Sequence, residues 1–444
     1  MGTLIYGLGE SGIAATKALL GRGEEVVAAD ASDGERLRRV LEELGVEGSL
    51  GADPGILDGV DRVVASPGIR PQDAVLRAAE VRGIPVVSEV ALGLEMLGPE
   101  VRVAAITGTN GKTTVADMLR RILQAADVPH TVAGNSWHAL TGCLDEVRAA
   151  GLLVLEVSSF QLHYLRSPGF EVAALLNARP DHLNWHASFE EYVRDKLRVF
   201  EGQGPEDLAL VSAGDPVGRE AAQYLTSGVL VVGEGDTAVR EGELFLRGSK
   251  IADASELCFA GAHHHLENAL FAAAAAEGFG VAVEGIRAGL LGYRLRPHRV
   301  EVVAERDGVV YVDDSKATNP AAVAAALSSC QRPVVLILGG SEKETDFAEV
   351  LPHLDGCRAI ICQGEAGPSI FQYLKSAGWG DLCRLVADLR GAVAEAEALA
   401  RRGDVVLLSP GCASFDQFAG YAERGEEFAR LVTDPVGRLG VIRR

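Results

Sequence analysis

A glycine-rich stretch with a lysine and a threonine carries the strongest chemical signal in this sequence. It reads Gly108-Thr109-Asn110-Gly111-Lys112-Thr113, follows an apolar run at 101–107 and precedes apolar residues at helical spacing. Backbone N–H groups of such a loop can surround phosphates, the lysine adds positive charge, and the hydroxyl can bind Mg²⁺. The stretch predicts a triphosphate-binding loop, with Ile106 standing where the strict pattern has its first glycine.

Acidic and histidine residues follow two other apolar runs. Glu156 lies near the end of the run at 152–157, and Asp181-His182 follow the run at 172–176. Because parallel strands open onto one crevice at their carboxyl ends, Glu156 is predicted to hold Mg²⁺ directly or through water. His182 is open to three roles: general base, ligand of Mg²⁺ or Mn²⁺, or hydrogen-bonding group for a substrate. Lys196 lies in a helical stretch, and spacing alone assigns it no function.

A second glycine turn lies near the N-terminus. Gly7-Leu8-Gly9-Glu10-Ser11-Gly12 matches GxGxxG, and Asp30 ends the next strand, where a ribose-binding acid would stand. This pattern fits a dinucleotide, another nucleotide, or no ligand. A third strand, at 62–65, ends in Ser66-Pro67-Gly68.

Polar residues also gather after three strands near the C-terminus. Asp313 to Asn319 follow one strand, Lys343 follows the next one, and Ser409 to Ser414 follow the last. Two lysines and a serine at three strand ends suit an anionic amino acid.

Strands and helices alternate throughout the chain, which predicts an α/β fold with parallel sheets. Turn residues interrupt the pattern near 98–99 and 296–297. We therefore predict three domains: a Rossmann-like domain at 1–98, a central P-loop-type ATP-binding domain at 99–296, and a Rossmann-like domain at 297–444. Residues 204–260 are expected to form short strands and turns.

Composition excludes several classes of protein. The chain of 444 residues is 48% hydrophobic and has a net charge of −20 without a basic cluster, which argues against nucleic acid as a partner. No apolar run reaches the ~18 residues of a membrane span, and the N-terminus lacks the layout of a signal peptide. Seven cysteines without a CxxC pair indicate free thiols. These features predict a cytoplasmic protein that does not bind membranes.

Four stretches together resemble the Mur ligase family: 107–114, 156–162, 313–319 and 408–418. The first is shared with folylpolyglutamate synthetases, while the third and fourth are more specific, and the resemblance spans essentially the whole chain. It implies an ATP-dependent ligase that joins D-glutamate to UDP-N-acetylmuramoyl-L-alanine through an acyl phosphate, releasing ADP and phosphate. It also implies two Mg²⁺ sites, and we expect a monomer.

The resemblance assigns roles residue by residue. The implied ATP-binding residues are Gly108, Thr109, Asn110, Gly111, Lys112, Thr113, Thr114, Asn268, His298, Arg299 and Asp314. The implied metal ligands are Thr113, Glu156, His182 and Lys196, where Lys196 matches a lysine that CO₂ converts to a carbamate. The implied catalytic residues are Lys112, His182 and Lys196.

The same resemblance places the two other substrates. The implied residues for the UDP-linked precursor are Gly7, Gly9, Gly12, Ser66, Pro67, Gly68, Asn135 and His182. The implied residues for glutamate are Lys316, Thr318, Lys343, Ser414 and Tyr421. The sequence departs from the family pattern at Trp137, Pro180, His265 and Tyr421, and residues 31–37 match no uracil-binding residues clearly.

Two alternatives stay open at this stage. One is another ligase of the same superfamily, such as a folylpolyglutamate synthetase. The other, from a different class, is a dehydrogenase-like or non-catalytic nucleotide-binding protein that uses the N-terminal glycine turn.

Overall fold

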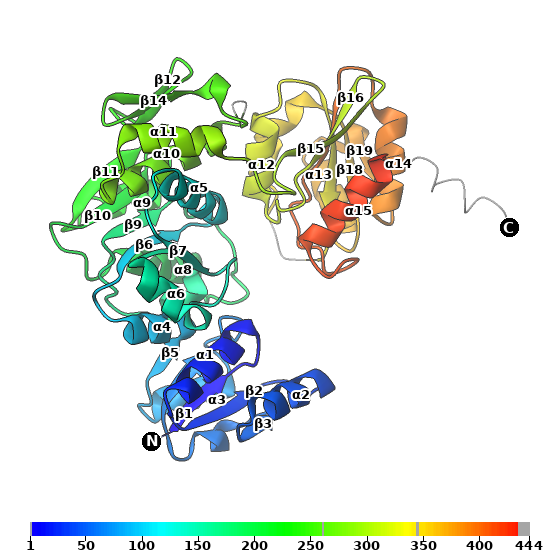
Figure 1. The fold of residues 1–444 in the computed structure, drawn as a ribbon. Coiled ribbons are helices and arrows are strands. Elements are labelled where there is room, and N and C mark those ends of the chain that lie inside the picture. Colours follow the sequence, from blue (N-terminus) through cyan, green and yellow to red (C-terminus); the bar gives the residue numbers. More distant parts are fainter. Residues whose placement is uncertain (1, 260–261, 343–345, 434–444) are drawn as a thin grey trace. The chain divides into compact units, whose positions relative to one another are not determined.

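The computed structural model describes residues 2–259, 262–342 and 346–433, so Lys343 lies outside the described residues. The chain divides into two compact units. The first comprises 1–257 and 265–293, and the second comprises 258–264 and 294–444. Figure 1 shows the elements of each unit. Among the described residues, no helix combines the length and the apolar character that crossing a bilayer requires.

The first unit begins with a five-stranded parallel sheet. Its strand order is β3 (Gly48–Leu50), β2 (Val26–Asp30), β1 (Gly2–Tyr6), β4 (Val60–Ala65) and β5 (Val86–Ser88). Its helices are α1 (Glu10–Gly21), α2 (Glu35–Leu44), α3 (Ala74–Val81) and α4 (Glu89–Leu97). Successive side chains of β1 enter different cores, because Leu4 packs with Val63 and Ile5 packs with Val64. Both faces of this sheet are therefore covered.

A six-stranded parallel sheet follows in the same unit. Its order is β11 (Gly228–Val232), β10 (Leu208–Ser212), β9 (Val172–Leu175), β6 (Arg102–Thr107), β8 (Leu152–Glu156) and β7 (Thr131–Gly134). β6 comes first in the chain yet lies between β9 and β8. The chain builds the sheet first on one side of β6, with β7 and β8, and then on the other side, with β9 to β11. Ligands of open α/β sheets bind where the strand order reverses in this way.

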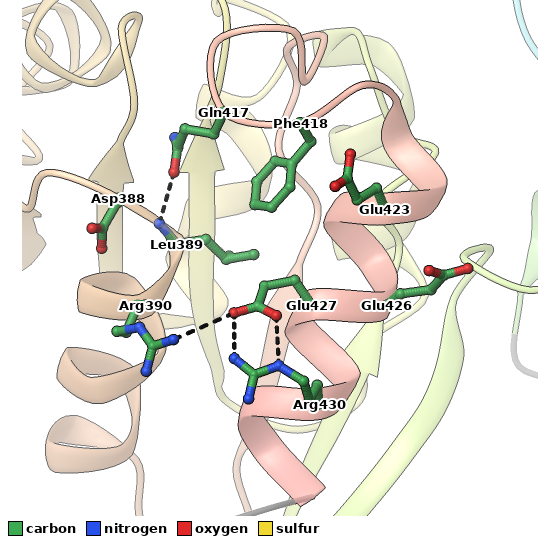
Figure 2. A pocket seen from close by; sticks show the side chains of 9 residues that line it. All are labelled: Asp388, Leu389, Arg390, Gln417, Phe418, Glu423, Glu426, Glu427 and Arg430. Carbon is green, nitrogen blue, oxygen red and sulfur yellow. Dashed lines mark hydrogen bonds and ion pairs between the residues drawn. The ribbon is translucent and has the colours of Figure 1, made fainter. Parts of the chain in front are cut away.

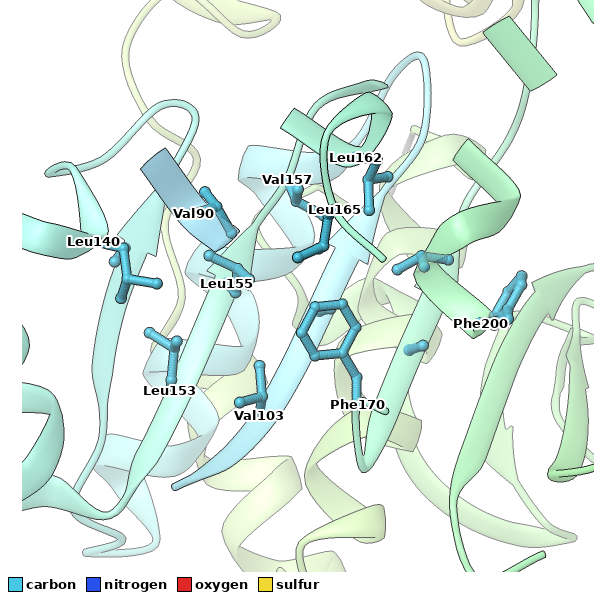
Figure 3. Packing of buried hydrophobic residues seen from close by; sticks show 14 of the residues in the cluster. Val90, Val103, Leu140, Leu153, Leu155, Val157, Leu162, Leu165, Phe170 and Phe200 are labelled. Carbon is cyan, nitrogen blue, oxygen red and sulfur yellow. The ribbon is translucent and has the colours of Figure 1, made fainter. Parts of the chain in front are cut away.

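Helices cover the central sheet. They are α5 (Lys112–Ala125), α6 (Leu144–Ala150), α7 (Ser159–His163), α8 (Phe189–Leu197), α9 (Pro216–Ala221), α10 (His263–Gly278) and α11 (Val283–Gly292). α11 approaches α5 closely, since a Cβ on Gly289 would lie 2.4 Å from the Cα of Ile122. A hydrophobic core of the central sheet contains Leu155, Phe170 and Leu140, together with Val90 of α4 (Figure 3). Helix α4 thus packs on the central sheet as well as on the N-terminal sheet.

A small antiparallel sheet interrupts this unit. It consists of β12 (Ala238–Arg240), β13 (Glu243–Leu246) and β14 (Ser249–Asp253). Its two turns contain Glu241-Gly242 and Arg247-Gly248, and all four of these residues have positive φ angles. Two consecutive positive φ angles are typical of the type I′ turns that join two-residue hairpins. The short strands and turns expected at 204–260 are present, together with helix α9, which was not predicted.

The second unit contains a six-stranded sheet. Its order is β15 (Glu301–Arg306), β16 (Val309–Asp313), β20 (Val405–Leu408), β17 (Val334–Gly339), β18 (Cys357–Gln363) and β19 (Cys383–Leu385). Its helices are α12 (Pro320–Ser328), α13 (Gly367–Ser376), α14 (Leu389–Leu399) and α15 (Tyr421–Thr433). Leu336 and Ile337 of β17 enter opposite cores, so this sheet is also buried on both faces.

The structure confirms the predicted α/β class, with three large sheets along the chain. Two parts of the structure are antiparallel instead. The β12–β14 sheet is antiparallel, and β15 runs antiparallel to β16. The physical reason is the short connection, because two residues can join only antiparallel neighbours, whereas parallel neighbours need a long crossover.

Candidate active site

The predicted phosphate loop runs from the end of β6 to the start of α5. Gly108 has φ +156° and Gly111 has φ +89°, which are backbone conformations that residues other than glycine rarely adopt. A Cβ on Gly111 would lie only 2.7 Å from the Oδ1 of Asn268 on α10. Asn268 therefore lies against the loop.

The segment after β9 holds the loop in place. The backbone N–H of Thr109 donates to the carbonyl of Asn177 at 2.9 Å, and the N–H of Asn110 donates to the Asn177 side chain at 2.9 Å. The Thr109 hydroxyl lies 2.8 Å from the Tyr192 hydroxyl. These contacts fix the loop backbone before any ligand binds, which is the preorganisation that phosphate recognition requires.

Two lysines converge on one carbonyl of the loop. Lys112 Nζ donates to Gly108 O at 2.7 Å, and Lys196 Nζ donates to the same oxygen at 2.8 Å. Lys196 is 1% exposed and lies over the Tyr192 ring. Burial, and then the charge of Lys112, hold the pKa of Lys196 well below its ordinary value, while Asp181 acts in the opposite direction. The lysine to which spacing gave no role is therefore buried beside the phosphate loop.

Glu156 lies at the end of β8 and is fully buried. Its Oε1 accepts from the hydroxyls of Thr113 at 3.2 Å and Ser136 at 2.9 Å, and from Asn135 Nδ2 at 3.2 Å. Its Oε2 accepts from the indole N–H of Trp137 at 3.0 Å. The structure brings three predicted residues together here, and it gives the unusual Trp137 a contact with the predicted metal ligand.

His182 lies on the loop after β9, in a left-handed conformation with φ +56°. Its backbone N–H donates to Asp181 Oδ1 at 2.8 Å, its ring meets the Phe160 ring edge-on, and its side chain is 44% exposed. Within the described ranges, two groups of His and acidic side chains are close enough to share a metal ion: His163–Glu191–Asp195 and His298–Glu301–Asp313. Neither group contains His182 or Glu156.

The N-terminal glycine turn is held by its own residues. Gly7 has φ +103°, and its carbonyl accepts from Ser66 Oγ at 2.8 Å. A Cβ on Gly12 would lie 1.9 Å from that carbonyl, so only glycine fits there. Asp30 accepts from the backbone N–H of Leu8 at 2.8 Å and from a second N–H two residues beyond itself. Gly9, Pro67 and Gly68 follow β1 and β4 at the same edge of this sheet.

In the second unit, the predicted ATP-binding residues lie before β15 and after β16. His298 Nδ1 is 2.6 Å from Asp313 Oδ2. Asp314 accepts from the Ser409 hydroxyl at 2.8 Å. Burial raises the pKa of Asp314 to about 7, although Ser409 and the charge of Arg299 act against that rise.

The predicted glutamate-binding residues of this unit come from three segments. Lys316 Nζ lies 4.0 Å from the centre of the Tyr421 ring, within the range of a cation–π contact. Ser414 is buried on the loop after β20, and Thr318 is half-buried on the loop after β16. Lys316, Ser414 and Tyr421 therefore belong to segments that meet at the carboxyl edge of one sheet.

Sequence reasoning missed several residues of these sites. Ser136 and Tyr192 contact Glu156 and the phosphate loop, yet they lie in segments without a recognisable spacing. Arg424 on α15 joins loops of the second unit through hydrogen bonds. Only Asn177 had a usable signal, because it directly follows an apolar run that leads to the same sheet edge.

Three family models match the chain. They describe a Mur ligase MurD-like N-terminal domain at residues 1–88, a Mur ligase middle domain at 106–276, and a Mur ligase glutamate ligase domain at 298–412. A phosphate loop whose threonine contacts a buried carboxylate at the end of a parallel strand is typical of proteins that bind a nucleoside triphosphate with Mg²⁺, and the three family models are those of ATP-dependent amide-bond-forming ligases. The chain belongs to the Mur ligase family.

Curated relatives match along almost the full length. UDP-N-acetylmuramoylalanine–D-glutamate ligase of Rubrobacter xylanophilus is 71% identical, with 97% of both chains covered. The enzyme of the same name from Pelotomaculum thermopropionicum is 37% identical, covering 97% of this chain and 96% of its own. The MurF ligase of Thermotoga maritima in complex with ADP has a TM-score of 0.60 at 19% identity, covering 91% and 93%. That structure shares the fold.

Proposed function

We propose that this chain joins D-glutamate to UDP-N-acetylmuramoyl-L-alanine at the expense of ATP, releasing ADP and phosphate. Relatives of that name match 97% of the chain. The carrying observation in the structure is the loop at 108–113, where Lys112 lies beside the glycine backbone and Thr113 contacts buried Glu156. This arrangement suits a triphosphate with its cation.

The loop at 108–113 holds the phosphates of ATP. Its backbone N–H groups lie at the N-terminus of α5, where the helix dipole favours anions. Lys112 turns from the carbonyls it now contacts toward the β- and γ-phosphates. Asn268, which lies against Gly111, contacts the nucleotide from α10. His298, Arg299 and Asp314 are further residues that we propose for nucleotide binding.

The residues around Glu156 fit Mg²⁺. Thr113 and Glu156 offer oxygen atoms 3.2 Å apart, and Mg²⁺ prefers oxygen ligands. When bound, Mg²⁺ neutralises the charge that develops on the transferring phosphoryl group. A second site comprises His182 and a modified Lys196. That pair requires Lys196 to become an anion, because an ammonium group repels a cation.

Carbamylation of Lys196 meets this requirement. Lys112 and Lys196 donate to the same oxygen of Gly108, so their two Nζ atoms cannot both be charged without strong repulsion in a buried site. A neutral Lys196 amine forms an N–C bond with CO₂ and releases one proton to solvent. The resulting carbamate carries a negative charge, which turns the repulsion from Lys112 into attraction.

The reaction proceeds in two steps. The alanine carboxylate attacks the γ-phosphorus, the bond to the β-phosphate oxygen breaks, and ADP leaves. The amine of D-glutamate then attacks the acyl carbon, the bond to phosphate breaks, and the amine proton is lost. His182 is exposed enough to accept that proton if it does not bind metal. Most of the rate enhancement comes from positioning and neutralisation of charge.

The remaining substrates bind at the other two sheets. The UDP-linked precursor binds at the edge formed by Gly7, Gly9, Gly12 and the 66–68 turn, with Asn135 and His182 contacting its muramoyl end. Asp30 accepts the N–H of Leu8 in the glycine turn with one oxygen and the N–H of Ser32 with the other, which supports a role other than ribose recognition in NAD. D-Glutamate binds at Lys316, Thr318, Lys343, Ser414 and Tyr421. The chain acts as a cytoplasmic monomer.

A substrate-omission assay tests the proposal. Phosphate release should require ATP, UDP-N-acetylmuramoyl-L-alanine and D-glutamate together, and L-glutamate should not replace the D-enantiomer. Lys112→Ala should abolish phosphate release. Lys250→Ala, in strand β14 of the small antiparallel sheet, should not change it. Release with a folate substrate, or binding of NADH without ATP turnover, would refute the proposal.

A further inference from the structure

Arg424 is the largest fully buried side chain among the described residues. It lies in the first turn of α15, and its guanidinium has five N–H donors. They make five hydrogen bonds. Nε donates to Ser315 Oγ at 2.9 Å, Nη1 donates to Cys412 O and Ala413 O at 3.1 Å each, and Nη2 donates to Ser315 O at 2.8 Å and Cys412 O at 3.1 Å. Every donor is therefore used on two loops.

These two loops carry the proposed glutamate-binding residues. Ser315 directly precedes Lys316 on the loop after β16, and Ala413 directly precedes Ser414 on the loop after β20. A third loop approaches the same point. A Cβ on Gly340, after β17, would lie 2.1 Å from Ala413 O and 3.0 Å from Arg424 Nη1. Arg424 therefore lies where all three strand-end loops meet.

The hydroxyl of Ser315 links this arrangement to Tyr421. It accepts from Arg424 Nε and donates to the carbonyl of Tyr421 at 2.8 Å. The Tyr421 ring in turn faces Lys316 Nζ at 4.0 Å. The position of the Lys316 ammonium thus depends on a chain of contacts that begins at Arg424.

The guanidinium also brings a buried positive charge, and the carboxylates of Asp416 and Asp313 are close enough to act on it. Within the described part of the chain, all of its hydrogen-bond acceptors are carbonyl or hydroxyl oxygens. Burial lowers the pKa of Arg424 to about 10, so it stays charged at neutral pH. Carbonyl oxygens satisfy the donors without cancelling the charge.

We propose that Arg424 is a positioning residue for the amino-acid substrate, because its hydrogen bonds hold the 315–316 and 412–414 loops together. The inference rests on the proposed function, because it takes D-glutamate as the ligand of these loops. The inference adds a residue that does not itself contact the substrate, because the Arg424 side chain is buried and acts on amino-acid binding through the loops that it holds.

Steady-state kinetics of Arg424→Lys and Arg424→Ala test this role. We expect Arg424→Lys, which keeps the charge but loses most of the hydrogen bonds, to raise KM for D-glutamate on the order of tenfold, equivalent to about one charge-assisted hydrogen bond. Arg424→Ala should raise it further. Guanidinium ion added to Arg424→Ala should lower that KM again, because the deleted group leaves a cavity of its own shape.

The first half-reaction separates this role from a general loss of structure. Acyl-phosphate formation from ATP and the UDP-linked precursor, measured without D-glutamate, should change less than threefold in Arg424→Lys. The matched control is Arg430→Met on the same helix. Arg430 bonds to Glu427 at the outer groove between α14 and α15 (Figure 2) and should leave every constant unchanged.

The outcomes distinguish the two levels of the argument. If wild-type protein releases phosphate without D-glutamate dependence, the proposed function itself fails. If wild-type activity is as proposed, but Arg424→Lys raises KM for ATP, precursor and D-glutamate equally, or raises none of them, the positioning role of Arg424 is wrong. Guanidinium that restores Arg424→Ala for all three substrates alike would also contradict it.

Discussion

Replacing Gly111 by alanine is expected to disable the phosphate loop through one added methyl group. Gly111 has φ +89°, and a left-handed conformation costs a residue with a Cβ about 1–2 kcal/mol. The new Cβ would also lie 2.7 Å from Asn268 Oδ1 and 3.0 Å from Leu176 Cδ1, so both neighbours must move. Overpacking of this kind costs about 1–3 kcal/mol more. We expect a total loss in unfolding free energy of about 2–5 kcal/mol.

The effect on nucleotide binding should be larger than the effect on stability. Displacing the loop backbone removes N–H groups from the phosphates. Each charge-assisted hydrogen bond contributes about 1.5–3 kcal/mol, so losing two weakens binding on the order of 10²- to 10⁴-fold. Isothermal titration with ADP and Mg²⁺ measures this affinity directly, and phosphate release measures turnover.

Gly45→Ala is the matched control. Gly45 ends α2 with φ +65°, and a Cβ there would meet nothing within 4 Å. It carries the backbone penalty alone, so it should cost about 1–2 kcal/mol and leave ADP affinity unchanged. The reasoning is refuted if Gly111→Ala binds ADP like wild type, or if it costs no more stability than Gly45→Ala.

Three further predictions concern ionisable groups. Glu156→Gln leaves four donors facing a side chain with one acceptor oxygen; turnover should fall at least about a hundredfold in a phosphate-release assay, and normal Mg²⁺ dependence would contradict the assignment. Lys196→Ala should be inactive in the same assay and partly recover with millimolar acetate or propionate; absence of recovery would count against the carbamate. Asp314 has a folded-state pKa raised from 3.8 to about 7, so its contribution to stability is present below pH 3.8 and is lost as pH rises to about 7. Urea unfolding of wild type and Asp314→Asn at pH 5 and pH 8 should show a smaller loss in the variant, and equal losses would disprove the linkage.

The phosphate loop was predictable because its signal is local. An apolar strand, a glycine turn and an amphipathic helix are adjacent in the sequence, and Gly108 and Gly111 have the positive φ angles that glycine permits. Lys196 was not predictable from its surroundings. It lies in a helix with charged neighbours on both sides, and its burial arises because α8 packs against a loop 88 residues earlier in the chain.

The antiparallel strands have a sequence signal in the two-residue turns that join them, and the apolar patterns of the strands do not contain this signal. Asp307-Gly308, Glu241-Gly242 and Arg247-Gly248 each join two short apolar segments, and in each pair both residues have positive φ. Aspartate before glycine is a strong hairpin signal, whereas glutamate or arginine before glycine is weak. The hairpin at Asp307-Gly308 could therefore have been predicted from the sequence, whereas the other two hairpins follow from tertiary context.

Helix α4 has a consequence for how the molecule moves. Glu89, at its first position, accepts the N–H and the hydroxyl of Thr141 at 2.6 and 2.7 Å, and Val90 is buried with Leu140. Separating the N-terminal sheet from the ATP-binding sheet would expose buried apolar surface to water. It would also leave the buried Glu89 carboxyl without its hydrogen-bond donors. We therefore expect the two sheets to stay together as one body, and we expect a fragment cut before α4 to expose apolar surface on both pieces and to aggregate.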